Sequence, residues 1–290
     1  MKSPLSMFTT SKGEAEFKSA YADVLKLWPV PYKEIDIPTL FGDTHVIISG
    51  SEELPPLVLL HATGASAAMW FPNIESLSAK YCVFAVDIIG DAGKSIQTRL
   101  LTNRDDCGDW LLQVLDGLGL QKTNLGGLSY GGWHTLNFSM VAPHRINKLV
   151  VMAPGASILP FSWPVLLLLR ILPYFPVKPN PFPNFFCKGF KPSKVYVRLF
   201  AIGIQHFKYP DPRKSIFTGV FSEDELRTIK LPVLFLVGEK EVIYDPRAVI
   251  EKISRLIPQI ETHIIPEASH FLSMEQPQAV TAHILKFLAA

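Results

Sequence analysis

The stretch Gly127-Leu128-Ser129-Tyr130-Gly131 decides the fold of this chain. It lies between a strand-like run, 123–126, and a run with helical character, 133–141. A Gly-x-Ser-x-Gly pentapeptide in that setting predicts a nucleophile elbow, a sharp turn that exposes the serine hydroxyl at its tip. Both glycines fit because a side chain at either position would crowd the turn. The hydroxyl of Ser129 is also expected near a helix N-terminus, where unpaired N–H groups favour a developing negative charge.

Strand-like and helix-like runs alternate on both sides of this turn. A helical run at 14–27 and an antiparallel strand pair at 33–37 and 44–48 come first. Further strands are predicted at 57–60, 82–87, 121–126, 146–152, 231–237 and 260–265, and helices at 69–79, 103–118, 130–142, 246–257 and 275–288. This alternation predicts an α/β fold, in which a mostly parallel central sheet is flanked by helices.

Residues 154–212 break the alternation, because they hold 11 of the 24 prolines and are rich in Phe and Leu. A structureless loop of that length is uncommon in a compact domain. We therefore expect an inserted, mainly helical cap at 154–215 over the C-terminal edge of the sheet, and a core made of 1–153 and 216–290. The alternative is a disordered Pro-rich linker, which the large apolar content disfavours.

Composition excludes several classes of function. A net charge of +2, with Lys and Arg scattered along the 290 residues, does not indicate a nucleic-acid-binding protein. The three cysteines lack metal-ligand spacing and fit a reduced, cytoplasmic protein, and the N-terminus has no signal-peptide pattern. The most apolar segment, 161–177, contains three prolines and Arg170 and is too short to span a membrane.

A serine nucleophile needs a base, and the base needs a third group to orient it. In α/β sheets such groups lie at the C-terminal ends of strands, and after an elbow serine the chain order is acid and then histidine. Of the eight histidines, His270 falls in the loop between the last predicted strand and the last predicted helix. We therefore predict that His270 is the base.

Two carboxylates compete for the third position. Glu241 and Asp245 both follow the predicted strand 231–237. Asp245 precedes Pro246, a pattern typical of a helix N-cap, and such a structural role makes it the weaker candidate. We favour Glu241 and keep Asp245 as the alternative acid.

An oxyanion hole requires two N–H donors. The predicted donors are the backbone amides of Tyr130, directly after the serine, and Thr63, in the loop after strand 57–60. No metal or organic cofactor is expected, because the nucleophile, base and donors all come from the chain. The run 90–95 ends like a phosphate-binding loop, but Ile88 stands where that motif requires glycine.

Five segments together resemble the α/β-hydrolase superfamily, and the chain is similar over nearly its whole length to bacterial carboxylesterase-type serine hydrolases that carry a cap. The segments are His61-Ala62-Thr63-Gly64, residues 87–95, the elbow, Gly238-Glu239-Lys240-Glu241 and Ala268-Ser269-His270. Two positions depart from the family pattern. Ala62 replaces a glycine, and Glu241 stands where Asp is usual, which keeps Asp245 in consideration.

The resemblance implies a serine hydrolase that cleaves small carboxylic esters through an acyl-enzyme on Ser129, and the apolar cap predicts a substrate with an apolar part. One alternative keeps the same residues but hydrolyses thioesters, lactones or carbon–carbon bonds, or carries out perhydrolysis. A second alternative is a non-catalytic protein that binds a small molecule. The sequence makes no prediction of the oligomeric state.

Overall fold

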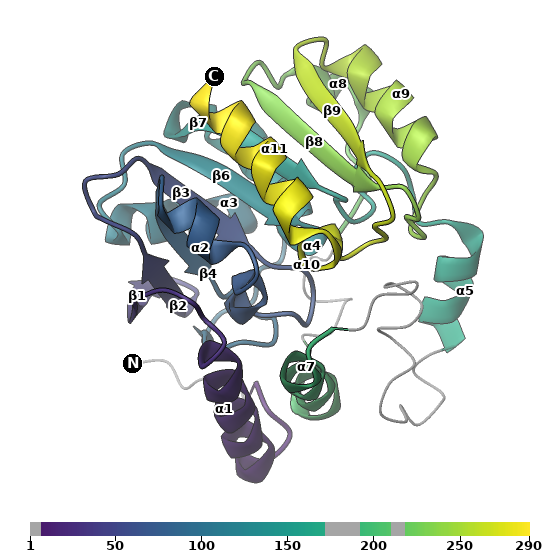
Figure 1. Cartoon of the computed structure of the whole chain (residues 1–290). Coiled ribbons are helices and arrows are strands. Elements are labelled where there is room, and N and C mark those ends of the chain that lie inside the picture. The colour runs from purple at the N-terminus through teal and green to yellow at the C-terminus, as the bar shows by residue number, and fades with distance from the viewer. Residues whose placement is uncertain (1–6, 172–191, 210–217) are drawn as a thin grey trace.

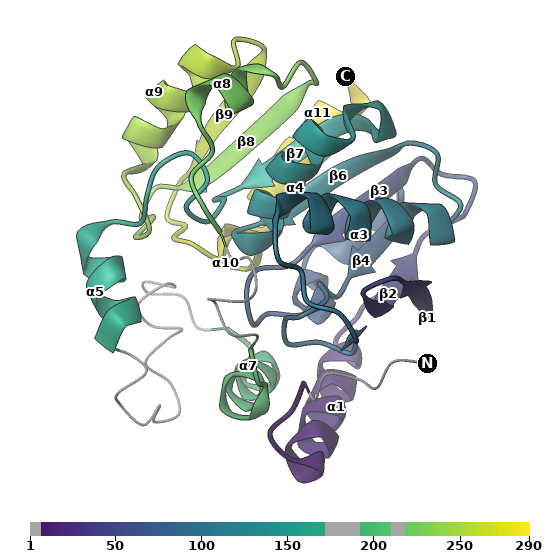
Figure 2. The same ribbon diagram turned by 180° about the vertical axis from the view of Figure 1, so that it is seen from behind.

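The computed structural model describes residues 7–171, 192–209 and 218–290, and the side chains of 168–171 are not among them. A twisted sheet forms its centre, with helices on both faces (Figures 1 and 2). The strands are β1 (Tyr32–Thr39), β2 (Gly42–Ser49), β3 (Pro56–Leu60), β4 (Cys82–Val86), β5 (Ile96–Gln97), β6 (Thr123–Leu128), β7 (Ile146–Met152), β8 (Val233–Gly238) and β9 (Ile260–Ile265). All eight predicted strands are confirmed, and the sequence reading missed only the two-residue β5.

The strand order is β1-β2-β4-β3-β6-β7-β8-β9, and β5 pairs with β2. β1, β2 and β5 pair antiparallel, as do β2 and β4, whereas all pairs from β4 to β9 are parallel. Every residue of β4, β6 and β8 is buried, as expected for parallel strands with helices on both faces. Parallel pairing brings the C-terminal ends of β3, β6 and β8 to one edge of the sheet.

The main helices are α1 (Ser11–Leu25), α3 (Arg104–Gly117), α4 (Tyr130–Val141), α9 (Pro246–Leu256) and α11 (Pro277–Ala289), with shorter α2 (Ile74–Ser78), α8 (Glu223–Arg227) and α10 (Leu272–Glu275). Helices α2 and α11 cover one face of the sheet, and α3 and α4 cover the other (Figures 1 and 2). Two short 3-10 turns are η1 (Ala67–Trp70) and η2 (Pro143–Arg145).

Two predicted helices are interrupted where prolines intervene. The predicted helix 69–79 is in fact η1 followed by α2, and Pro72, which lacks a backbone N–H, lies between them. The predicted helix 275–288 starts later, as α11, and a separate turn, α10, precedes it. Pro277 disfavours helical backbone at Gln276, which adopts φ −133° and ψ 60°.

Within the predicted cap the structure describes two helices, α5 (Trp163–Ile171) and α7 (Lys194–His206), while 172–191 and 210–215 lie outside the described residues. Helix α7 packs against α1, near the N-terminus (Figure 1). The contact is close, because a Cβ added at Gly13 of α1 would come within 2.6 Å of the His206 ring. The division into core and cap stays a prediction.

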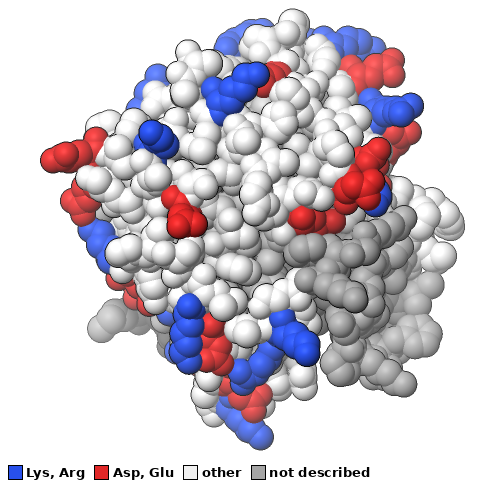
Figure 3. Space-filling model, in the orientation of Figure 1, with Lys and Arg blue, Asp and Glu red and all other residues white. Residues whose placement is uncertain are grey.

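Charges of both signs are interspersed on the face shown in Figure 3, where the described residues form no continuous basic patch. Among the described residues, no helix combines the length and the apolar character needed to cross a membrane.

The turn between β6 and α4 depends on its glycines. A Cβ at Gly127 would lie 2.3 Å from the carbonyl group of Gly131, and a Cβ at Gly131 would lie 2.2 Å from the Leu60 carbonyl oxygen. Both neighbours are backbone atoms, which cannot move without shifting β3 or α4. Ser129 itself adopts φ 54° and ψ −110°, a left-handed backbone that is strained for a residue with a side chain.

Replacing Gly131 by Ala is therefore expected to destabilise the fold. Overpacking of this kind costs about 2–3 kcal/mol, which for a protein of this size lowers Tm by about 5 °C or more. The matched control is Gly219→Ala, because a Cβ at Gly219 meets no atom within 4 Å. Thermal unfolding followed by circular dichroism tests the pair, and equal Tm values for the two variants would contradict this account of the turn.

Candidate active site

Ser129 lies at the end of β6, one residue before α4, with its side chain partly exposed. Its N–H donates to the Met152 carbonyl at 2.9 Å, and its own carbonyl accepts from Gly155 N–H at 3.0 Å and from Trp133 N–H at 2.9 Å. These bonds tie the strained residue to the end of β7 and to the first turn of α4. The hydroxyl is thus held at the C-terminal edge of the sheet.

His270 reaches Ser129 from the loop after β9. Its Nε2 lies 2.8 Å from Ser129 Oγ, and its side chain is buried. Its Nδ1 faces the Glu241 carboxylate, at 2.9 Å from Oε2 and 3.1 Å from Oε1. A carboxylate only accepts, so Nδ1 carries the proton, and Nε2 is left as the acceptor for the serine hydroxyl.

Glu241 follows β8, and its side chain is fully buried. Its Oε1 also accepts from the amides of Val242, at 2.8 Å, and Ile243, at 2.9 Å. These donors compensate the loss of water around a buried negative charge. They also fix the carboxylate so that its second oxygen faces the imidazole.

The structure brings Ser129, His270 and Glu241 together and leaves Asp245 outside the group. Asp245 is exposed and is the N-cap of α9, where Oδ1 accepts from Arg247 N–H at 2.8 Å and Ala248 N–H at 3.3 Å. This is the structural role expected from the Asp-Pro pair.

Backbone contacts set the spacing between the Glu241 and His270 loops. Lys240 N–H donates to the Ala268 carbonyl at 2.8 Å, and Glu239 N–H donates to the Ile265 carbonyl at 3.0 Å. Gly238 is required at the crossing, because a Cβ there would lie 2.2 Å from the Ser269 carbonyl oxygen. The two loops are therefore held as one unit.

The loop 61–66 lies beside the elbow, since Gly131 N–H donates to the His61 carbonyl at 3.0 Å. Three amides of this loop have acceptors: Ala62 N–H faces Met69 Sδ at 3.4 Å, Gly64 N–H donates to Asp91 Oδ1 at 2.9 Å, and Ala65 N–H donates to the Ala62 carbonyl at 3.0 Å. Among the described residues, the Thr63 N–H has no acceptor. It is therefore available to a ligand.

Two buried aspartates from the loop 87–95 hold this region. Asp87 accepts from Ala67 N–H at 2.6 Å and Lys94 N–H at 2.7 Å. Asp91 accepts from Gly64 N–H at 2.9 Å, a contact that the sequence reading missed. Burial raises the pKa of Asp91, although the nearby His61 and the N–H bonds from Gly64 and Ala92 oppose the rise.

Glu275 is a further residue that the sequence reading missed. Its carboxylate accepts from Ser269 N–H at 2.8 Å, from Ser269 Oγ at 2.7 Å and from Phe271 N–H at 2.9 Å. It thus binds the residues on both sides of His270. Burial raises the pKa of Glu275, so this carboxylate takes up a proton at higher pH than an exposed glutamate would. The sequence signal that could have indicated this role is an acidic residue shortly after the predicted catalytic histidine.

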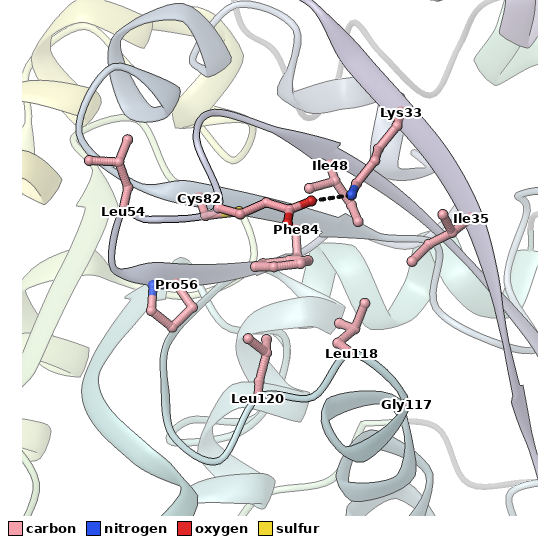
Figure 4. Close-up of a pocket in the computed structure, with 11 residues that line it drawn as sticks. Lys33, Ile35, Ile48, Leu54, Pro56, Cys82, Phe84, Gly117, Leu118 and Leu120 are labelled. Atoms are coloured by element: carbon pink, nitrogen blue, oxygen red, sulfur yellow. Dashed lines mark hydrogen bonds and ion pairs between the residues drawn. The ribbon is translucent and has the colours of Figure 1, made fainter.

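A cavity of about 330 Å³ lies away from these residues, at the N-terminal ends of β3 and β4. Its walls are mostly apolar and include Phe84, Leu118 and Leu120 (Figure 4). Lys33 and Glu52, which form an ion pair, also line it. No residue of the serine site lines it.

The model of the alpha/beta hydrolase family matches residues 57–283, a range that contains Ser129, Glu241 and His270. The chain belongs to the alpha/beta hydrolase family. Among the relatives of this alpha/beta hydrolase is a Bacillus subtilis (strain 168) protein described as the uncharacterized carboxylesterase nap. The two are 40% identical over 281 residues, which cover 94% of this chain and 92% of the relative. Carboxylesterase YbfK of the same organism is 34% identical over 287 residues, covering 97% and 96%.

Solved structures agree with this assignment. The crystal structure of naproxen esterase (carboxylesterase NP) from Bacillus subtilis superposes with a TM-score of 0.90 and 38% identity, covering 96% of this chain and 99% of that one. The structure of carboxylesterase CesB (YbfK) from Bacillus subtilis gives a TM-score of 0.88 and 34% identity, covering 96% and 98%. The expected α/β-hydrolase fold is thereby confirmed.

The contacts of Glu275 predict a rate effect without a binding effect. Glu275→Gln removes the charge that holds Ser269 and Phe271, which lets His270 drift from Ser129, and such misplacement lowers kcat. We expect about a tenfold loss of kcat on a p-nitrophenyl ester, with KM nearly unchanged. The control is Glu267→Gln, an exposed glutamate paired with Lys240. Equal kcat values for the two variants would contradict the proposal that Glu275 positions His270 through Ser269 and Phe271.

Proposed function

We propose that the protein hydrolyses carboxylic esters through an acyl-enzyme on Ser129, with His270 as base and Glu241 as the acid that orients it. The observation that carries the proposal is the continuous contact from Glu241 through His270 to Ser129, with 2.9 Å at one end and 2.8 Å at the other. Relatives of 40% and 34% identity that are named carboxylesterases support the same reaction.

In the first half-reaction, Ser129 Oγ attacks the ester carbonyl carbon, and its proton passes to His270 Nε2. The imidazolium that forms is stabilised by the Glu241 carboxylate at Nδ1, which does not itself take the proton. When the tetrahedral intermediate collapses, the C–O bond breaks, and His270 gives its proton to the departing alcohol. The acyl group is left on Ser129.

In the second half-reaction, a water molecule takes the place of the alcohol. His270 accepts its proton while the oxygen attacks the acyl carbon, and the proton then returns to Ser129 Oγ as the carboxylic acid leaves. We propose the backbone amides of Thr63 and Tyr130 as the oxyanion hole in both steps. The absence of another acceptor for Thr63 N–H among the described residues supports this role, and one such donor is worth about 10²–10³ in kcat.

We propose that the substrate is a small ester with an apolar part. Phe200 and Phe271 are buried beside the site in an edge-to-face pair with ring centroids 6.2 Å apart. Phe271 directly follows His270, and Phe200 lies 3.4 Å from the position of a Cβ on Gly64. Aromatic walls favour an apolar acyl or alcohol group. The similar crystal structure named naproxen esterase agrees with such a substrate.

We further propose that residues 154–215 cap this site and that the protein is cytoplasmic. The helices α5 and α7 support a helical cap. The unpaired, buried Cys82 and Cys107 agree with a reducing compartment, whereas Cys187 lies outside the described residues.

Covalent labelling tests the nucleophile. A fluorophosphonate is expected to modify the intact protein once, on the peptide that contains Ser129, because the activated hydroxyl attacks phosphorus as it attacks a carbonyl. Mass spectrometry identifies the peptide, and Ser129→Ala is expected to abolish the label. A protein that stays unlabelled while a control esterase reacts would rule out the hydrolase and favour a non-catalytic binding protein.

Two isosteric substitutions test the acid. Glu241→Gln can no longer hold the reactive tautomer of His270, and we expect kcat on a p-nitrophenyl ester to fall about 10³–10⁴-fold. Asp245→Asn is the matched control, because asparagine is an equally good helix N-cap, and its kcat is expected to stay within about twofold of the wild type. A large loss confined to Asp245→Asn would reverse the assignment.

A further inference from the structure

A group of metal-ligating side chains lies outside the serine site. Among the described residues, this group consists of Glu261, His263 and His283. One possible ligand atom from each residue lies within 4.8 Å of those from the other two. Glu261 and His263 are two residues apart on β9, so they face the same side of the sheet. His283 comes from α11, which covers one face of the sheet (Figure 1).

The contacts within the group are close. His263 Nε2 lies 2.7 Å from Glu261 Oε1, and the rings of His263 and His283 are 4.1 Å apart between centroids, tilted by 38°. Each imidazole can offer a ring nitrogen to a metal ion, and the two rings lie side by side within reach of one carboxylate.

We propose that Glu261, His263 and His283 form a binding site for a divalent transition-metal ion, with Zn²⁺ as the best fit. Two imidazole nitrogens and one carboxylate oxygen suit Zn²⁺, Cu²⁺ or Ni²⁺, whereas Mg²⁺ and Ca²⁺ prefer sites made of oxygen alone. The set leaves a fourth tetrahedral position for water. This proposal is independent of the esterase reaction.

The geometry permits closure around the ion. Zn–N and Zn–O bonds of about 2.0–2.2 Å place tetrahedral ligand atoms about 3.4 Å apart, less than the present upper limit of 4.8 Å. The side chains of His263 and Glu261 are 33% and 40% exposed, so they can rotate towards the ion, and solvent has access to the site. The ion would replace the hydrogen bond that now joins them.

The consequence of binding would be structural. β9 is the last strand at one edge of the sheet, and α11 is the last helix, so the ion would join the edge strand to this helix. The ligands come together only in the folded chain, and binding to the folded state alone raises Tm. Metal ions bind only deprotonated imidazole, so the affinity for Zn²⁺ falls as the pH is lowered.

Zinc titration of the metal-free, full-length protein tests the site. In competition with a chromophoric chelator at pH 7.5, the wild type is expected to take up one Zn²⁺ more than His263→Gln/His283→Gln, and to show a higher Tm with Zn²⁺ than with EDTA. The matched control His144→Gln replaces an exposed histidine elsewhere and should keep both effects. Co²⁺ should give the visible spectrum of a tetrahedral site in the wild type and in the control only.

Equal Zn²⁺ uptake by the wild type and the double variant would overturn the proposal, because any ion bound at His270 or on other histidines survives that change. Equal Tm values with Zn²⁺ and EDTA in the wild type would overturn it as well. Glu261→Gln, which keeps the size of the side chain, guards against a folding defect in the double variant. It should unfold like the wild type in EDTA but bind Zn²⁺ at least tenfold more weakly.

Discussion

The close approach of the elbow to the end of β3 is the constraint on which the rest of the site depends. Gly131 N–H donates to the His61 carbonyl, and no side chain fits at Gly131 against the Leu60 carbonyl. The same contact does two things. It holds Ser129 in a backbone conformation that an ordinary turn would relax, and it brings the 61–66 loop beside the hydroxyl. This contact thus brings Ser129 and the proposed oxyanion donor together, alongside the backbone bonds of Ser129 to Met152, Gly155 and Trp133.

The buried carboxylates illustrate a second constraint, since each needs donors before it can be buried. Glu241 uses one oxygen for the amides of Val242 and Ile243, which leaves the other for His270. Glu275 uses both oxygens on Ser269 and Phe271. In each case local amides stabilise the charge, and the charge in turn fixes the loop. The histidine is therefore positioned through its side chain by one glutamate and through its backbone by the other.

Much of the fold could be predicted from sequence, because parallel strands are continuous apolar runs and because the elbow fixes where β6 ends and α4 begins. The choice between Glu241 and Asp245 could also be predicted from the sequence, since an Asp before a Pro is typical of a helix N-cap.

The features that could not be predicted from the sequence depend on contacts between distant segments. Gly64 with Asp91, Glu275 with the amides around His270, and His263 with His283 leave no periodic pattern. The two interrupted helices had a local signal, Pro72 and Pro277, that apolar periodicity obscured.

The use of Glu where the family pattern has Asp follows from the same backbone geometry. Glu241 N–H donates to the Gly238 carbonyl at 3.2 Å, so the chain turns tightly directly after β8. Lys240 N–H meanwhile holds the His270 loop through Ala268. Glu241 therefore lies in a turn whose backbone is held by hydrogen bonds on both sides. Its side chain reaches His270 Nδ1 and also accepts from the two amides that follow it. Oε1 accepts from the amides of Val242 and Ile243 while Oε2 lies 2.9 Å from His270 Nδ1, so one carboxylate joins the turn after β8 to the imidazole.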